Sequence, residues 1–172
     1  ALTVSYTIAL RRVPILDIAA IAGGFVLRAV AGGVAAPVTL SRWFVLVVTS
    51  AAVLVAAAKR QAELRRTETA GVNGRSVLER YGAARLRLII VGSAAVALFA
   101  YAVWAFALPD IDGIPWRPLT IIPFAACLAR YGVLVRSGGG EAPEEMLLSD
   151  RWLALAGVVW LVVFALSVHA AG

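Results

Sequence analysis

The sequence contains a long apolar stretch from Leu86 to Leu108, which reads LRLIIVGSAAVALFAYAVWAFAL and indicates the type of fold. Apart from Arg87, near its start, it contains no charged residue. An α-helix rises about 1.5 Å per residue, so about 20 apolar residues cross the roughly 30 Å hydrocarbon core of a lipid bilayer. The stretch is therefore predicted to be a transmembrane helix.

Four further apolar runs accompany this one, two before it and two after it. We expect them to span at Pro14–Ala35, Arg42–Ala58, Pro118–Leu134 and Trp152–Ala170. The connector from 109 to 118 contains three prolines and is expected to be a polar, non-helical loop. The predicted fold class is an all-α polytopic transmembrane helical bundle.

The composition agrees with a membrane protein. Of the 172 residues, 62% are hydrophobic and 15% are charged, against about 25% charged residues in an average soluble domain. This balance excludes a water-soluble monomer. Cys127 is the only cysteine, which excludes a disulfide framework and a cysteine-based metal site. The net charge of +6 would suit nucleic acid, but the charges lie in the loops between apolar runs, so we expect no nucleic-acid partner.

The basic residues are distributed unevenly between the two ends of the predicted spans. Arg42 and Arg117 fall at one end, and Arg28 lies inside a span. Thirteen of the sixteen fall at the other end: Arg11, Arg12, Lys59, Arg60, Arg65, Arg66, Arg75, Arg80, Arg85, Arg87, Arg130, Arg136 and Arg151. Because basic loops are retained on the cytoplasmic side, this end is predicted to be cytoplasmic.

The connector at about 59–86 is too long for a turn. We expect a helical extension, a break at Gly71–Gly74 and then a short amphipathic helix. Ser76 and Glu79 have the spacing of a capping box for that helix. The alternative interpretation is a solvated run of charge that only obeys the positive-inside rule.

Arg28 is an ionisable residue within a span, which costs at least about 2.5 kcal/mol and favours a functional role. Asp17 precedes it by eleven residues, which leaves the two within about 20° of one helix face. The pair could line a polar cavity. The alternative is helix packing along the small residues Ala20, Gly24 and Gly32, with Arg28 bonded to a neighbouring carbonyl.

A cluster of charge lies at the end of the second span. Lys59, Glu63 and Arg66 share one helix face, with Arg60 beside them. Lysine offers a point charge and arginine a two-pronged donor to phosphate oxygens, while Glu63 could hold Mg²⁺ or orient Lys59. The alternative is an ion pair that ends a helix. Tyr6 and Arg11, at the neighbouring mouth, favour a shared anion site.

Four short motifs follow one another along the chain. They are Tyr6-x-x-x-Leu10-Arg11 ahead of Asp17, Leu27-Arg28-Ala29-x-Ala31-Gly32-Gly33-Val34-Ala35, Ala58-Lys59-Arg60-x-Ala62-Glu63-Leu64, and Leu78-Glu79-x-Tyr81. Their order and spacing resemble the UbiA-type intramembrane transferases. The resemblance covers residues 1–172, which would correspond to the C-terminal portion of a single transmembrane domain, from the end of its fourth helix to its ninth. The initial Ala1 also suggests the later part of a longer protein.

Ordinary members of that family bind a prenyl diphosphate through Mg²⁺ on two Asp-rich motifs, the second of the form Asp-x-x-x-Asp. Lys59-x-x-x-Glu63 stands in its place here. A cation in that position favours the branch of the family that transfers phosphoribose. The first Asp-rich motif, with the principal carboxylates, would lie upstream of Ala1.

The resemblance implies a glycosyltransferase of the bacterial plasma membrane, with its active-site loops in the cytoplasm. It would move 5-phosphoribose from phosphoribosyl diphosphate to a polyprenyl (decaprenyl) phosphate for cell-wall arabinan synthesis, with Mg²⁺ as cofactor, and it is compatible with a homo-oligomer. The residues expected to bind substrate phosphates are Tyr6, Arg11, Lys59, Arg60, Glu63, Arg66 and Tyr81.

Two other classes of function stay open. A UbiA-type prenyltransferase with an aromatic acceptor should carry a carboxylate where Lys59 stands. A transporter would suit Asp17 and Arg28, but a conduction path needs polar groups throughout the membrane depth, whereas these charges gather at one end. The third interpretation is a purely structural membrane subunit, and only the order of the motifs argues against it.

Overall fold

The computed structural model describes residues 14–36, 40–69, 82–107, 114–138, 145–146 and 149–169. Five long helices and one short helix lie within these ranges. They are α2 (Pro14–Ala35), α3 (Arg42–Thr69), α5 (Ala83–Phe106), α6 (Trp116–Leu119), α7 (Ile121–Arg136) and α9 (Arg151–His169). Five segments are long and apolar enough to cross a membrane, with α6 and α7 together forming one of them. The predicted fold class, a polytopic helical bundle, is confirmed.

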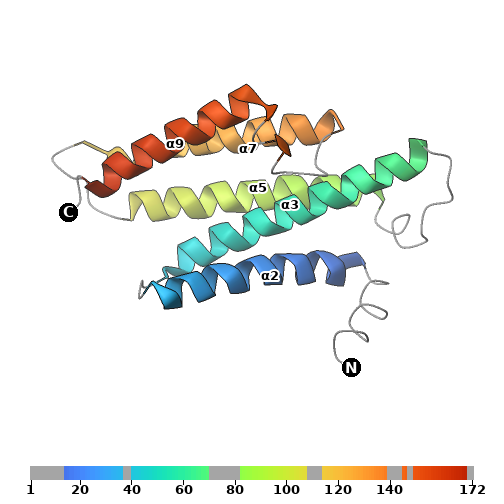
Figure 1. Ribbon diagram of the computed structural model, residues 1–172, viewed down its shortest axis with the longest axis horizontal. Coiled ribbons are helices and arrows are strands. Elements are labelled where there is room, and N and C mark those ends of the chain that lie inside the picture. The colour runs from blue at the N-terminus through green and yellow to red at the C-terminus, as the bar shows by residue number, and fades with distance from the viewer. Residues whose placement is uncertain are drawn as a thin grey trace.

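The helices lie side by side in three layers, with α7 and α9 above, α3 and α5 in the middle and α2 below (Figure 1). The helix α3 packs against both α2 and α5, and α7 packs against α5 and α9. Successive spans run in opposite directions (Figure 1). The starts of α2, α5 and α9 therefore share one end of the bundle with the ends of α3 and α7.

We name the two ends of the bundle by their side chains. The basic end comprises these described residues: Asp17, Lys59, Arg60, Glu63, Arg65, Arg66, Arg85, Arg87, Arg130, Arg136, Asp150 and Arg151. The aromatic end comprises Arg42, Trp43, Phe44, Tyr101, Trp104, Arg117, Thr120, Phe124, Trp160 and Phe164. The grouping of the basic loops at one end, which the alternation of spans predicted, is present in the structure.

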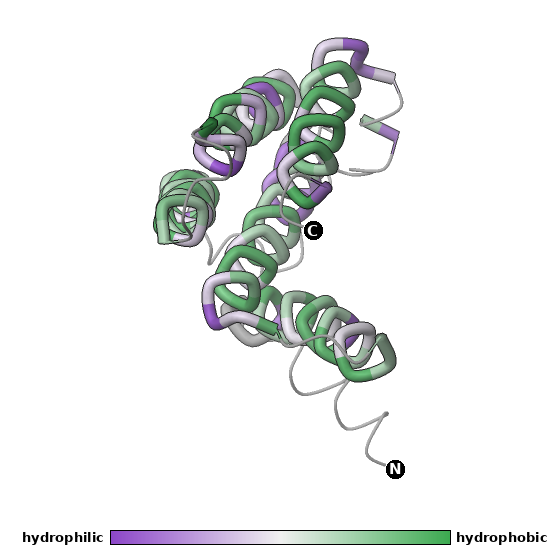
Figure 2. The backbone as a smooth tube through the Cα atoms, turned by 90° about the vertical axis from the view of Figure 1, so that its left-hand side faces the viewer, coloured by the Kyte–Doolittle hydropathy of each residue, from purple (hydrophilic) through white to green (hydrophobic). Residues whose placement is uncertain are grey.

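The core lies where α3 meets α5. Ala57, Ala58 and Leu86 are fully buried there, and small residues at such a contact let two helix backbones approach closely. The helices are apolar along most of their length (Figure 2), and many large apolar residues are exposed on them. Leu27 and Leu88, for example, are 71% and 72% exposed. An apolar exterior of this extent suits contact with lipid.

The span boundaries agree with the predictions to within a few residues, except at α3. That helix continues beyond Ala58 to Thr69, which confirms the predicted helical extension. The predicted break and second helix of the connector lie outside the described residues. Tyr6, Arg11 and Tyr81, three of the predicted phosphate-binding residues, also lie outside them.

The prediction that the connector from 109 to 118 is non-helical is wrong for its last part. Trp116–Leu119 forms the short helix α6. Pro115 occupies the position before its first residue, and Pro118 lies within its first turn. Proline is tolerated at both places because the N–H groups of a first helical turn have no partner within the helix.

Candidate anion-binding site at the basic end

The last turns of α3 present one buried face and one outward face. Ala58, Ala62 and Leu64 are buried against the bundle, whereas Lys59 and Arg66 are exposed. The shared outward face that the spacing predicted is therefore present. This outward face belongs to helix α3, whose opposite face is packed in the core.

Arg60 joins α2 to α3. Its Nε lies 2.5 Å from Oδ2 of Asp17, and its Nη1 is paired with Oε2 of Glu63. The side chains of Arg60 and Asp17 are only 18% and 20% exposed. The Nε–H has no aligned hydrogen-bond acceptor within the described part of the chain, so its attraction to Asp17 is ionic. We call Asp17, Arg60 and Glu63 the ion triad.

Asp17 is well placed for this role. It lies in the first turn of α2, where the positive end of the helix dipole favours a carboxylate. Ile18, the next residue, is buried in the same core cluster as Leu54 and Ala58 of α3. Apolar packing and the ion pair therefore fix the same contact between the two helices.

The ion triad bears on the two interpretations of the cluster on α3, as a phosphate site or as an ion pair that ends the helix. Glu63 pairs with Arg60, three residues before it, and Arg60 is an ion-pairing residue, as the structural alternative proposed. Among the described side chains Lys59 has no ion-pair partner, and it is exposed. Lys59 is thus a cation of this cluster that no described side chain pairs.

The structure does not bring Asp17 and Arg28 together. Arg28 is exposed on α2, and its guanidinium carbon lies 5.9 Å from the centre of the Phe25 ring. Asp17 is instead engaged with Arg60. Two residues that are eleven positions apart on one helix are separated by about 16 Å along its axis. Lying on the same side of the helix does not bring them closer. The polar-cavity role of the two residues stays a prediction.

A second charged contact at the basic end joins α7 to α9. Arg130 donates from Nε and Nη2 to the two oxygens of Asp150, at 3.0 and 2.5 Å. Oδ1 of Asp150 also accepts from the backbone N–H of Leu153 at 2.8 Å, which caps the start of α9. The hydrogen bonds from Arg130 and Leu153 lower the pKa of Asp150 to about 2.

Sequence reasoning missed this contact, although a signal was present. An aspartate directly before an apolar run is a typical helix start, and Asp150 has that position. A further link, in which Arg65 donates from Nη1 to the carbonyl oxygen of Arg136 at 2.8 Å, ties the extension of α3 to the end of α7. No simple sequence pattern predicts a side chain bonded to a distant carbonyl.

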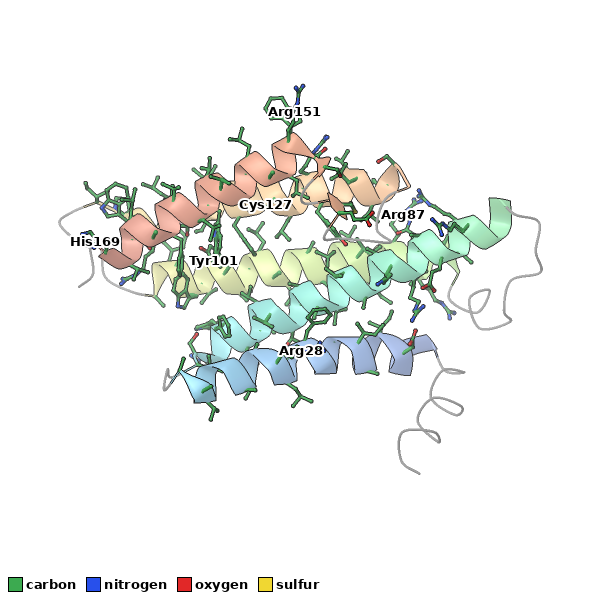
Figure 3. All side chains as sticks on the ribbon, viewed as in Figure 1. Arg28, Arg87, Tyr101, Cys127, Arg151 and His169 are labelled. Carbon is green, nitrogen blue, oxygen red and sulfur yellow. The ribbon has the colours of Figure 1, made fainter. Side chains whose placement is uncertain are left out.

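The aromatic end is held by neutral hydrogen bonds in series. Trp160 donates from Nε1 to the Tyr101 hydroxyl at 2.9 Å, which donates to the Thr120 hydroxyl at 2.7 Å. Thr120 in turn donates to the carbonyl oxygen of Arg117 at 2.5 Å. Figure 3 places Tyr101 and Arg87 toward opposite ends of the bundle.

An apolar cavity of about 690 Å³ adjoins this chain of hydrogen bonds. Small residues of α2, including Gly32 and Gly33, line one side of it. Aromatic residues such as Phe44, Trp104 and Phe164 line the other. Its lining carries no charged side chain, so it does not suit a phosphate group.

The sequence predicts one candidate metal ligand at the basic end, Glu63. Among the described residues no group of three or more His, Cys, Asp or Glu side chains converges. Glu63, the predicted metal ligand, directs its carboxylate to Arg60. The role of Glu63 as a metal ligand stays a prediction.

The fold and the site together define a class of protein. It is a polytopic helical membrane bundle in which one end is rich in cations and suited to anions, while the other end is rich in aromatic residues and contains only two arginines among its defining residues, Arg42 and Arg117.

Comparison with curated proteins shows which members of this broad class the chain is similar to. The chain is 36% identical over 171 residues to the decaprenyl-phosphate phosphoribosyltransferase of Corynebacterium glutamicum. It is 34% identical to the protein of that name from Mycolicibacterium smegmatis and 33% identical to that from Mycobacterium tuberculosis. Each match covers 98% of this chain. No protein-family model matches.

These relatives are UbiA-type enzymes, so the resemblance predicted from the order of motifs is confirmed. The chain covers 52%, 56% and 55% of the three relatives, and thus spans about half of their length.

Proposed function

We propose that the whole protein transfers 5-phosphoribose from phosphoribosyl diphosphate to a polyprenyl phosphate such as decaprenyl phosphate. The observation that carries the proposal is the similarity, along 98% of the chain, to curated proteins named for that reaction. The product would serve as the precursor of cell-wall arabinan.

The proposed reaction is a substitution at the anomeric carbon of ribose. A phosphate oxygen of the lipid forms a new bond to that carbon, and the bond from the carbon to the diphosphate breaks. The diphosphate leaves with the bonding electron pair, and no net proton transfer is needed. Because both reactants are anions, the protein's main task is to bring mutually repelling phosphates together.

Lys59 is the residue of α3 best placed for that task. It is exposed at the basic end beside a contact between two helices, so its ammonium group can meet a phosphate oxygen without first breaking an ion pair to any side chain in the described ranges. Arg66 lies on the same outward face. Arg60 and Glu63 act on the substrate only through the ion triad. Tyr6, Arg11 and Tyr81 stay proposed phosphate ligands from the neighbouring segments.

The location of the reaction follows from the two substrates. The sugar donor is soluble and the acceptor is a membrane lipid, so the proposed site must lie at the bilayer surface. The concentration of cations at one end supports a cytoplasmic position for that end in the plasma membrane. A homo-oligomer is compatible with this arrangement.

Magnesium is part of the proposal through the donor. When bound, Mg²⁺ would neutralise charge on the leaving diphosphate, and it is usually held by one or two carboxylates together with substrate phosphates. The described carboxylates of α2 and α3 are engaged with Arg60. We therefore assign none of them as a ligand and derive no step from the ion.

The test is a transfer assay with the purified whole protein in detergent or lipid. Donor labelled in its ribose is mixed with decaprenyl phosphate and Mg²⁺, and label is measured in the organic phase. We expect label to enter the lipid only when decaprenyl phosphate is present, and a chelator to abolish it. Failure to label the lipid, together with transfer of a prenyl group from a prenyl diphosphate to an aromatic acceptor, would overturn the proposal.

A further inference from the structure

We propose that Asp17 of α2 is a positioning residue for the phosphate-binding side of α3, and that it acts by holding Arg60. This inference rests on the proposed function and adds to it a residue on another helix. Asp17 touches no substrate in this account. It determines which cation of α3 meets the substrate anion.

The first step of the argument is the burial of the ion triad. Asp17 and Arg60 are each about four-fifths buried, whereas Glu63 is 39% exposed. Removing one member of a buried pair leaves the other charge without compensation, and the remaining group then moves or recruits a new partner. Asp17 is consequently the stronger restraint on Arg60, and Glu63 is the more accessible one.

The second step is the charge of the cluster. Asp17 and Glu63 carry two negative charges, and Arg60 with Lys59 carries two positive charges. The four groups are therefore neutral together, and the charge of Arg60 is already committed. A phosphate that reaches this part of α3 meets Lys59 as a cation that has no carboxylate partner among the described side chains.

The third step is the consequence of losing Asp17. Arg60 would keep its pairing with Glu63 but lose its attachment to α2, and the cluster would gain one net positive charge. A flexible arginine would then compete with Lys59 for the donor's phosphates. The donor should bind at least as tightly as before, but in poses that do not place the anomeric carbon next to the lipid phosphate.

This consequence separates a positioning role from a merely structural one. A residue that only stabilises the bundle would lower the amount of folded protein and leave the Michaelis constant of that folded fraction unchanged. A positioning residue changes turnover and the Michaelis constant in the folded protein. The two constants move in the same direction here, because non-productive binding lowers both, and the misplaced donor pose lowers turnover further.

The experiment compares four variants of the whole protein, each purified in folded form. Asp17→Asn removes the charge, and Asp17→Glu keeps it. Asp17→Arg combined with Arg60→Asp restores the pair with reversed polarity. Arg42→Gln is the matched control, because Arg42 is an exposed arginine of α3 at the aromatic end, stacked on Trp43.

For Asp17→Asn we expect turnover to fall roughly 10–150-fold, the range for loss of a contact to a charged group. We expect the Michaelis constant for phosphoribosyl diphosphate to fall by about two- to fivefold, as for one added surface charge. Asp17→Glu and the reversed pair should regain a large part of the turnover. Arg42→Gln should match the wild type.

Wild-type values of both constants for folded Asp17→Asn would overturn the inference, as would a reversed pair no more active than Asp17→Asn. Activity of Asp17→Asn that is restored by extra Mg²⁺ would also overturn it, because that result makes Asp17 a metal ligand. If the wild-type protein itself transfers no phosphoribose, the proposed function fails. The two failures can be told apart, because the role of Asp17 can be rejected only when the wild-type protein is active.

Discussion

The two ends of the bundle connect their helices through different kinds of polar contact. At the basic end, ion pairs connect neighbouring helices, with Arg60 joined to Asp17 and Arg130 joined to Asp150. At the aromatic end, a series of neutral hydrogen bonds runs from Trp160 through Tyr101. Both ends hold helices that are distant in sequence, but only the contacts at the basic end are formed between charged side chains.

The difference indicates where an anionic substrate can bind. Neutral hydrogen bonds satisfy polar groups within hydrocarbon at little cost, whereas charged groups in hydrocarbon are expensive. Charged pairs are therefore expected near the membrane surface, where water and phosphate groups are also present. The aromatic end, with its apolar cavity of about 690 Å³, can support the fold without touching an anion.

The largest expected effect follows from reversing the charge of Lys59. Lys59→Asp should abolish phosphoribosyl transfer, because it repels the donor at the exposed position of α3. Lys59→Ala should lower turnover over Michaelis constant roughly 10–150-fold, since it removes a charge-assisted contact of about 1.5–3 kcal/mol. Lys59→Arg should recover part of that loss.

Transfer at the wild-type rate by Lys59→Asp would contradict the assignment of anion binding to the basic end. It would show that the charged cluster on α3 only stabilises the end of that helix. The measurement is the transfer assay with each variant of the whole protein, and Arg42→Gln at the aromatic end is the control.

The second effect concerns the contact between α7 and α9. Because the pKa of Asp150 is about 2 in the folded protein, against an ordinary value of 3.8, its carboxylate stabilises the fold fully above about pH 4. That contribution is lost as the pH falls through the interval between these two values. We expect the melting temperature of Asp150→Asn to be lower than that of the wild type at neutral pH.

The pH dependence sharpens this prediction. The difference in melting temperature between wild type and Asp150→Asn should shrink as the pH falls from 5 towards 3. Thermal unfolding in detergent over this range measures it. A difference that is the same at every pH would show that the Asp150 charge contributes nothing beyond its hydrogen bonds.

The smallest effect is expected at the aromatic end. Tyr101→Phe removes a hydroxyl that both accepts and donates, and such bonds between membrane helices are worth about 0.6 kcal/mol on average. We expect a small loss of stability and no change in transfer. Tyr131→Phe is the matched control, because its buried hydroxyl has no hydrogen-bond partner in the described part of the chain.

Equal destabilisation by Tyr101→Phe and Tyr131→Phe would contradict the importance of the hydrogen-bond series. Loss of transfer in folded Tyr101→Phe would contradict the separation of the two ends. Both variants can be compared by unfolding in mixed micelles and by the transfer assay.

Much of the fold could be predicted from the sequence because span length and apolar composition are local properties. The runs around Pro14–Ala35 and Leu86–Leu108 are long enough to identify a bundle without any tertiary information. The helix α6 was missed because prolines such as those at 115 and 118 disfavour a helix everywhere except at its start, which is where both of them lie.

The site could be predicted only in part. The helical spacing of Lys59, Glu63 and Arg66 correctly gave their shared face. The partner of Arg60 could not be found in the same way, because Asp17 lies on another helix and the packing of α2 on α3 decides the contact. Angular position suggested Arg28 as the partner of Asp17 because it ignores distance along the helix axis.

The measurement that tests the central claim most directly is transfer by sealed membrane vesicles of known orientation. The claim is that the basic end, facing the cytoplasm, handles the soluble anionic donor, which does not cross a membrane. Inside-out vesicles containing the whole protein should label decaprenyl phosphate when the donor is added outside. Right-side-out vesicles should do so only after they are made permeable. Labelling by intact right-side-out vesicles, with little labelling by inside-out ones, would contradict the account.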